Sequence, residues 1–229
     1  MKKQTLIVDC DGVLYPKESL QLQEFVSAMN ETVLKFGISK ENYEKISSET
    51  KDQKPGMYNF IYALCDSNDK KYADFCQEMT QKVDYSRIER DEPLFELLKS
   101  MNDGKNFDVV ILTNNTRPHL EKVFDKLFDR SVEEFEYESG VMCYDITDMK
   151  YGDLFYPKQS QIGLKLFSQQ ISKKPQECIL VDDTSRNLEA AKNVGMGAVL
   201  INSELPLHKY LKSLSKSNNI SLNRNKSRY

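Results

Sequence analysis

Three short apolar segments of this sequence are each followed at once by polar residues. The segments are residues 5–8, 107–112 and 178–181, and the residues after them are Asp9 and Asp11, Thr113 and Asn114, and Asp182 and Asp183. Aliphatic and β-branched runs of this length are typical of buried strands. Because open α/β sheets bind their ligands at the carboxyl ends of the strands, these polar residues predict one site at that edge.

The remaining pattern alternates between helix and strand after residue 90. We expect helices over 93–101, 117–128, 159–171 and 188–194, and a further strand over 198–201. Strands separated by helices imply crossover connections and a parallel sheet. We therefore predict an α/β fold with a Rossmann-like parallel sheet, in which the aromatic-rich stretch 129–156 is left unassigned.

A long insertion with only helical patterns interrupts this alternation. Apolar residues at helical spacing predict helices from 22 to Gly37, from Ser39 onward, over 57–65 and over 72–83. We therefore divide the chain into a core, residues 1–15 and 91–213, and a helical unit, residues 16–90. Residues 214–229 are polar and basic, and we expect disorder there in preference to a site for an anionic partner.

Charge and composition exclude several classes of function. The 32 basic and 35 acidic residues give a formal net charge of -3, so no overall field attracts a nucleic-acid polymer. The apolar run at residues 6–8 is too short for an export signal, and no stretch approaches the ~18 residues of a membrane helix. The five cysteines form no Cys-x-x-Cys pair, which predicts reduced thiols and a cytoplasmic location.

The acidic residues at the predicted sheet edge also predict a metal. Asp9, Asp11, Asp182 and Asp183 would repel one another if they met there without a counter-ion. Mg²⁺ is a hard cation that takes oxygen ligands, and its binding commonly offsets the repulsion within such a group of carboxylates. We therefore expect Mg²⁺ as the cofactor.

These residues, together with a lysine before a later helix, occur in the order of four known motifs. The motifs are Asp9-Cys10-Asp11-Gly12-Val13, Thr113-Asn114, Lys158 and Asp182-Asp183. Over about residues 5–202 this order resembles the haloacid dehalogenase (HAD) superfamily. The resemblance implies a HAD-like core, an inserted helical cap of the C1 type over residues 16–90, and a phosphatase that hydrolyses phosphomonoesters.

The resemblance assigns the catalytic steps to the first motif. Asp9 would attack phosphorus and form an aspartyl-phosphate, and Asp11 would protonate the leaving oxygen and then activate water. Such a role requires a raised pKa of Asp11, which we expect the neighbouring carboxylates to supply. Dehalogenases lack an acid/base carboxylate at this position, so Asp11 favours phosphate chemistry.

Phosphate binding is assigned by the same resemblance to the second and third motifs. Thr113 and the backbone of Asn114 would hold the phosphoryl oxygens, and Lys158 would neutralise their charge. A helix-capping loop is the alternative for Thr113, and an ordinary solvated side chain is the alternative for Lys158. The chain also has Pro157-Lys158-Gln159 where the family often has Lys-Pro.

The last motif completes the implied metal site. Asp183 would be a direct ligand alongside Asp9 and the backbone carbonyl of Asp11, while Asp182 and Asn187 would support these ligands from behind. The sequence leaves open which of the two adjacent aspartates contacts the metal.

The substrate is constrained mainly by the helical cap. The cap, together with Leu14-Tyr15-Pro16 after the first motif, looks most like the pyrimidine 5′-nucleotidase-like branch. It implies a small phosphorylated substrate, with a nucleoside 5′-monophosphate as the first candidate. Aromatic residues within 58–62 and 135–156 would stack on a base or a phosphotyrosine, or fill the core. A protein phosphatase acting on phosphotyrosine and a catalytically silent phosphate-binding module remain the alternatives.

Overall fold

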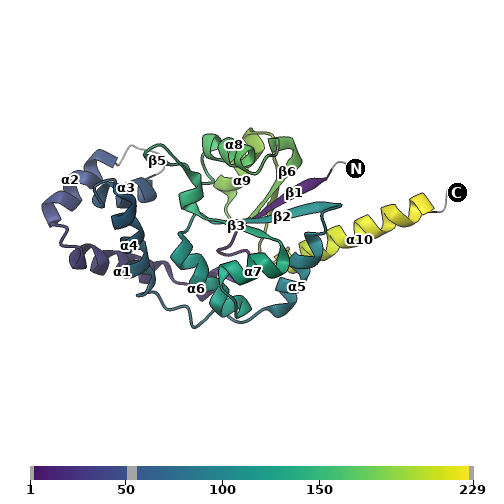
Figure 1. Ribbon diagram of the computed structural model, residues 1–229, viewed down its shortest axis with the longest axis horizontal. Helices are drawn as coiled ribbons and strands as arrows, with labels where there is room; N and C mark the ends of the chain where they lie inside the picture. Colours follow the sequence, from purple (N-terminus) through teal and green to yellow (C-terminus); the bar gives the residue numbers. More distant parts are fainter. Residues whose placement is uncertain (1–2, 51–55, 227–229) are drawn as a thin grey trace.

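A five-stranded parallel sheet forms the centre of the protein (Figure 1). The computed structural model describes residues 3–50 and 56–226 of the chain. The strands follow the spatial order β3-β2-β1-β6-β7. Their bounds are Gln4–Val8 for β1, Phe107–Leu112 for β2, Met142–Tyr144 for β3, Cys178–Asp182 for β6 and Gly197–Leu200 for β7. The predicted α/β fold with a parallel sheet is confirmed.

The central strand β1 lies between the other two strands that end in polar residues. Leu6 is paired with Val109 of β2 on one side and with Ile179 of β6 on the other. Leu6 and Ile7 are both fully buried, as expected for a strand covered by helices on both faces. The carboxyl ends of β1, β2 and β6 therefore lie next to one another at one edge of the sheet.

Helices cover both faces of this sheet. Contacts join α5, α6 and α7 into one layer and place α9 against β6 and β7, with α8 packed on α9 (Figure 1). Their bounds are Glu92–Met101 for α5, Arg117–Phe128 for α6, Val132–Ser139 for α7, Gln161–Gln170 for α8 and Ser185–Asn193 for α9. This two-sided cover leaves the carboxyl edge of the sheet as the place for a site.

Four helices form a separate group beyond that edge, inserted between β1 and α5 (Figure 1). They are α1 (Leu22–Lys35), α2 (Lys40–Thr50), α3 (Gly56–Leu64) and α4 (Asp69–Thr80), preceded by a short 3-10 helix, η1 (Lys17–Ser19). No strand occurs among the described residues of this insertion. We call these helices the cap.

A small hairpin from the core holds the cap. It consists of β4 (Lys150–Tyr151) and β5 (Leu154–Phe155), and it follows the 3-10 helix η2 (Ile146–Met149). Asn59 of α3 accepts a hydrogen bond of 2.8 Å from the Phe155 backbone N–H and donates one of 3.3 Å to the Phe155 carbonyl. Lys150 forms an ion pair with Asp69 of α4. The unassigned stretch 129–156 thus supplies α7, β3 and the support of the cap.

The carboxyl-terminal stretch differs from the predicted disordered tail. The last helix, α10, runs from Leu207 to Lys226, so residues 214–226 are helical; residues 227–229 lie outside the described part of the chain. Leu207 and Leu211 are buried and dock the first turns of the helix. Extending a helix that is already nucleated is far easier than starting one, so the polar residues beyond continue it. None of the described helices is long and apolar enough to cross a membrane.

Candidate active site

The carboxylates at the ends of β1 and β6 meet in space. One oxygen each from Asp9, Asp182 and Asp183 lies within 4.8 Å of the other two. Asp9 directly follows β1, while Asp182 is the last residue of β6. The pairing of the two strands continues one step beyond β1, because the Asp9 backbone N–H donates to the carbonyl of Val181 at 2.9 Å. The parallel pairing therefore produces the acidic cluster that the sequence predicts.

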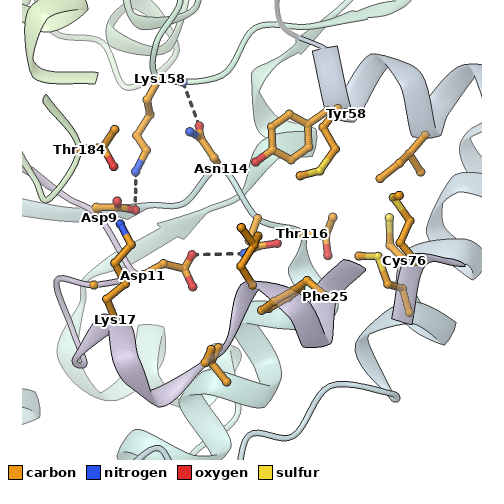
Figure 2. A pocket seen from close by; sticks show the side chains of 18 of the residues that line it. Asp9, Asp11, Lys17, Phe25, Tyr58, Cys76, Asn114, Thr116, Lys158 and Thr184 are labelled. Carbon is orange, nitrogen blue, oxygen red and sulfur yellow. Dashed lines mark hydrogen bonds and ion pairs between the residues drawn. The ribbon is translucent and has the colours of Figure 1, made fainter. Parts of the chain in front are cut away.

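Asp9 is held in one orientation. Its side chain is only 7% exposed, and Oδ1 accepts a hydrogen bond of 2.7 Å from the backbone N–H of Cys10. The same oxygen forms an ion pair with Lys158 (Figure 2). A carboxylate fixed in this way is preorganised to attack from a single direction.

Lys158 is buried and shared between two carboxylates. Its ammonium group contacts Asp9 and lies 3.0 Å from Oδ2 of Asp182. Burial lowers the pKa of Lys158, but the charges of Asp9 and Asp182 outweigh that effect and raise its pKa above the ordinary value. Lys158 is therefore a buried cation, and not the solvated side chain that was the alternative.

Asn114 fixes the segment that carries this lysine. Its Oδ1 accepts a hydrogen bond of 2.9 Å from the Lys158 backbone N–H, and its Nδ2 donates to Oε1 of Gln159 at 3.3 Å. The contact joins the end of β2 to the loop before α8. The sequence Pro157-Lys158-Gln159 is thus compatible with a lysine at the centre of the site.

The two adjacent aspartates have different surroundings. Asp182 is fully buried, and its oxygens accept hydrogen bonds from the Thr184 backbone N–H and from Asn187. Asp183 is 14% exposed at its side chain and lies 3.0 Å from the ammonium group of Lys17, which is itself 73% exposed. Asp183 therefore faces the open side of the site, whereas Asp182 is occupied by protein contacts.

Asp11 is surrounded by hydrogen-bonding groups. Its Oδ1 accepts from the Tyr15 hydroxyl and lies 2.8 Å from Nε2 of His119. Its Oδ2 accepts from the Thr113 hydroxyl at 3.2 Å and from Nδ2 of Asn115 at 3.3 Å. In this arrangement the Thr113 side chain contacts Asp11 directly.

These contacts correct the expected electrostatics of Asp11. Burial raises the pKa of Asp11, but the charge and hydrogen bond of His119, with the hydrogen bonds of Tyr15 and Asn115, lower it well below the ordinary value. The prediction of a raised pKa is wrong because it considered only the neighbouring carboxylates. In the free protein Asp11 is a carboxylate.

The acidic cluster fits a hard cation. Burial raises the pKa of Asp9, the charges of Asp182 and Asp11 add to that effect, and Lys158 opposes it. Among the described residues, the cations that pair with Asp9, Asp182 and Asp183 are the buried Lys158 and the exposed Lys17, so these three carboxylates face two positive charges. A set of carboxylate oxygens with excess negative charge is the environment that Mg²⁺ prefers.

A cavity of about 360 Å³ connects this cluster to the cap (Figure 2). Asp9, Asp11 and Lys158 line one end, and residues of α1, α3 and α4 line the other. Of the aromatic residues expected to stack on a substrate, Tyr58 lines the cavity, whereas Phe135 and Phe155 are buried in the core.

Comparison with known proteins identifies the family. The haloacid dehalogenase-like hydrolases match residues 3–195. The chain belongs to this family. Comparison with curated proteins finds no match.

Several solved structures share the fold of this hydrolase at low sequence identity. A hydrolase from Pseudomonas syringae is 17% identical, with a TM-score of 0.54 and coverage of 93% of this chain and 99% of that chain. CbbY from Rhodobacter sphaeroides, in a complex with xylulose-(1,5)-bisphosphate, is 17% identical, with a TM-score of 0.53 and coverage of 88% and 87%. The HAD family enzyme BT-2542 from Bacteroides thetaiotaomicron, in a complex with magnesium and inorganic phosphate, is 16% identical, with a TM-score of 0.51 and coverage of 88% and 95%.

The HAD-like site also contains residues that the sequence analysis missed. They are Tyr15, Lys17, Asn115 and His119. Asn115 and His119 lie in the loop and first turn of α6 that follow the β2 motif, and Tyr15 and Lys17 follow the first motif closely. These residues could have been found by their closeness in sequence to a motif, because residues just beyond the end of a strand line the same edge of the sheet.

Proposed function

We propose that this hydrolase is a Mg²⁺-dependent phosphatase that cleaves phosphomonoesters through an aspartyl-phosphate at Asp9. The observation that carries the proposal is the position of Asp9. It is an almost fully buried carboxylate, ion-paired with Lys158 and grouped with Asp182 and Asp183. A nucleophile, a fixed cation and a metal-binding group at one cavity wall are the elements that phosphoryl transfer requires.

In the first step an oxygen of Asp9 attacks phosphorus, and the bond between phosphorus and the leaving oxygen breaks. Lys158 offsets the negative charge on Asp9 and on the transferring group. Asp11 is a carboxylate in the free protein, so it must first take up a proton, from solvent or from the monoanionic form of the substrate, as the complex forms. It then delivers this proton to the leaving oxygen and removes one from the water that hydrolyses the aspartyl-phosphate and restores Asp9. Thr113 and Asn114 hold Asp11 and Lys158 in place, and the backbone at Asn114 is our candidate for phosphoryl binding.

We assign the metal ligands to Asp9, Asp183 and the backbone carbonyl of Asp11. Asp183 is preferred over Asp182 because Asp182 is occupied by Thr184 and Asn187. Mg²⁺ bound there would neutralise the phosphoryl oxygens during transfer. The structural neighbour BT-2542, solved with magnesium and phosphate, supports this assignment.

The substrate we propose is a small phosphoester in the cytoplasm, with nucleoside 5′-monophosphates of the pyrimidine nucleotidase type as first candidates. Asp9 is only 5% exposed beneath the cap, which favours a small molecule over a phosphotyrosine on a protein surface. CbbY binds a small phosphorylated sugar, in agreement with this size. The five cysteines are free thiols, as in proteins of a reducing compartment.

The test is phosphate release from an aryl phosphate by the purified protein. We expect Mg²⁺-dependent turnover that EDTA abolishes and that Asp9→Asn lowers by at least about 1,000-fold. Asp108→Asn is the matched control, because Asp108 lies near the opposite end of β2 and pairs with Lys3 and Lys173 at the surface. Undiminished turnover in Asp9→Asn, or in EDTA, would show that the proposed mechanism is wrong.

A further inference from the structure

We propose that the cap end of the cavity binds the leaving group of the substrate, and that it selects a single uncharged, mainly apolar ring with one hydrogen-bonding atom directed at Thr116. The inference rests on the proposed phosphatase function and narrows its substrate class. We call this part of the cavity the leaving-group chamber. Its walls are Phe25, Val26, Met29, Ile61, Cys76 and Met79, and Thr116 lies where it joins the catalytic end.

Three cap helices supply the apolar wall residues of the chamber. Helix α1 contributes Phe25, Val26 and Met29, α3 contributes Ile61, and α4 contributes Cys76 and Met79 (Figure 2). Thioether and aromatic side chains together adapt well to the flat faces of a ring. The cap therefore presents the substrate mainly with hydrocarbon and sulfur, and the hydroxyls of Tyr58 and Tyr72 are its polar groups.

Charge is confined to the opposite end of the cavity. The charged residues that line it are Asp9, Asp11, Lys17, Lys158 and Asp183. None of them belongs to the cap helices α1, α3 and α4 among the described residues, and the two lysines are paired with carboxylates. Burial raises the pKa of Cys76 to about 12, so that wall group is a neutral thiol. The described walls thus offer no cation to a second phosphate.

The apolar surface continues to the mouth of the cavity. Leu22, Val26 and Met57 line it, although their side chains are 74%, 47% and 57% exposed. Exposed apolar side chains are ordinary when scattered, but a group of them at the mouth of one cavity marks a ligand-binding surface. A leaving group with an apolar body would cover them.

Thr116 supplies a polar group on the core side of the chamber. It is the residue before the first turn of α6, yet its side chain makes no capping hydrogen bond to the helix. The residue is 4% exposed, and its hydroxyl has no hydrogen-bond partner within the described chain. Figure 2 shows this side chain between Asp11 and the cap residues Phe25 and Cys76. A buried unpaired hydroxyl beside an apolar chamber is positioned to bind one polar atom of a ligand.

Hydroxyl-rich and doubly charged leaving groups are disfavoured by the same walls. Each sugar hydroxyl would lose its hydrogen bonds to water, and the chamber provides few replacements. The ribose hydroxyls of a nucleoside are included, so the chamber ranks nucleoside 5′-monophosphates below phosphate esters of a simple aromatic alcohol. A second phosphate would lose more, because it is charged. We therefore expect a sugar bisphosphate, the ligand of CbbY, to be a poor substrate of this chain.

The first experiment compares esters whose leaving oxygens are alike. Benzyl phosphate and glucose 6-phosphate both release a primary alcohol, so their difference reports binding of the leaving group. We expect kcat/KM for benzyl phosphate to exceed that for glucose 6-phosphate by roughly 100-fold. If Asp9-dependent hydrolysis occurs and glucose 6-phosphate is the equal or better substrate, the chamber assignment is overturned. If no monoester is hydrolysed with Mg²⁺, the proposed function itself fails.

The second experiment tests Thr116 with a ring that carries one acceptor atom. Thr116→Val keeps the shape of the side chain and removes its hydroxyl. We expect it to raise KM about 5- to 10-fold for a pyridylmethyl phosphate and by a smaller factor for benzyl phosphate, which has no acceptor atom in its ring. Thr116→Ser keeps the hydroxyl, so we expect it to retain the wild-type preference between the two esters. Equal effects on the two esters would overturn the role of the hydroxyl.

The third experiment places a charge in the chamber without disturbing the core. Val26 is half exposed on α1, so Val26→Lys should fold. We expect kcat/KM for benzyl phosphate to fall about 10-fold while that for a sugar bisphosphate rises. Ser27→Lys puts the same charge at the next position of α1, outside the cavity lining. Identical effects of the two lysines would show that the chamber is not the binding site.

Discussion

Nε2 of His119 lies 2.8 Å from Oδ1 of Asp11, and Nδ1 of the same ring lies 2.8 Å from the hydroxyl of Tyr85. The histidine is 1% exposed. It therefore links the residue proposed as acid and base to the segment that returns from the cap to the core. A ring held at both nitrogens restricts the carboxylate to one orientation.

We predict that His119→Ala lowers kcat by about 10- to 100-fold with a KM close to that of the wild type, because Asp11 becomes free to turn. His119→Gln keeps an amide group near Asp11 and should restore part of the rate. His208→Ala is the control, since His208 contacts Asp91 away from the site. Steady-state kinetics with an aryl phosphate measure these effects. An unchanged kcat in His119→Ala would refute a positioning role.

The lowered pKa of Asp11 predicts how its contribution to stability depends on pH. The unfolded chain has the ordinary aspartate pKa of about 4, and the folded protein has a lower one. The carboxylate therefore stabilises the fold above about pH 4, and this contribution is lost as the pH falls toward the folded-state pKa. Without Mg²⁺, urea unfolding should show a larger difference between the wild type and Asp11→Asn at about pH 6 than at about pH 3. A difference that does not vary with pH would contradict this assignment.

The strands and helices around the acidic cluster could be predicted because their signals are local. The strand Phe107–Leu112 and the helix Arg117–Phe128 have the predicted bounds, since a buried strand and an amphipathic helix are visible as runs and periods of apolar residues. The convergence of Asp9 and Asp183 then follows from parallel pairing alone.

The contacts around Asp11 could not be predicted in this way. His119 and Tyr85 are 34 residues apart, and the local sequence around each of them does not predict their contact. The hairpin β4–β5 has two residues in each strand, which is too short for an alternating pattern to be recognised. The helical state of residues 214–226 depends on how Leu207 and Leu211 pack, which composition does not reveal.

Lys17 is predicted to compete with a metal for Asp183. Its ammonium group lies 3.0 Å from Asp183 Oδ2 but is largely exposed, and exposed ion pairs contribute only about 0.2–1 kcal/mol. Lys17→Gln should therefore lower the Mg²⁺ concentration for half-maximal activity by no more than about fivefold. Lys40→Gln removes a comparable exposed pair on α2 and should have no effect. A higher Mg²⁺ requirement in Lys17→Gln would contradict the competition.

Gly12 is predicted to be essential for the position of Asp183. Its φ is +74°, and a Cβ at this residue would lie 2.6 Å from Asp183 Oδ2. Gly37 also has a positive φ, +67°, but no atom lies within 4 Å of its Cβ position. Gly12→Ala and Gly37→Ala should each lose about 1–2 kcal/mol of stability from the left-handed backbone.

Only Gly12→Ala should also raise the Mg²⁺ requirement, by at least about tenfold, since only there does the new methyl group displace a proposed ligand. Mg²⁺ titrations of activity and urea unfolding separate the two effects. Equal Mg²⁺ requirements in the two alanine variants would show that Asp183 tolerates the displacement or does not bind the metal.

Asn59 is predicted to be the main polar contact that holds α3 against the hairpin of the core. It pairs with both the N–H and the carbonyl of Phe155, and its side chain is buried. Asn59→Ala leaves those two backbone groups without this partner in a region closed to water, at a cost of about 1–3 kcal/mol.

Asn42→Ala, at an exposed position of α2, is the control and should change the free energy of unfolding by less than about 0.5 kcal/mol. Because Asn59 holds α3, whose residues Tyr58 and Ile61 line the cavity, Asn59→Ala should also raise KM while kcat for bound substrate changes little. Stability loss without any change in KM would mean that the cap keeps its position through its other contacts with the core, such as the Lys150–Asp69 ion pair and the packing of α4 on α6.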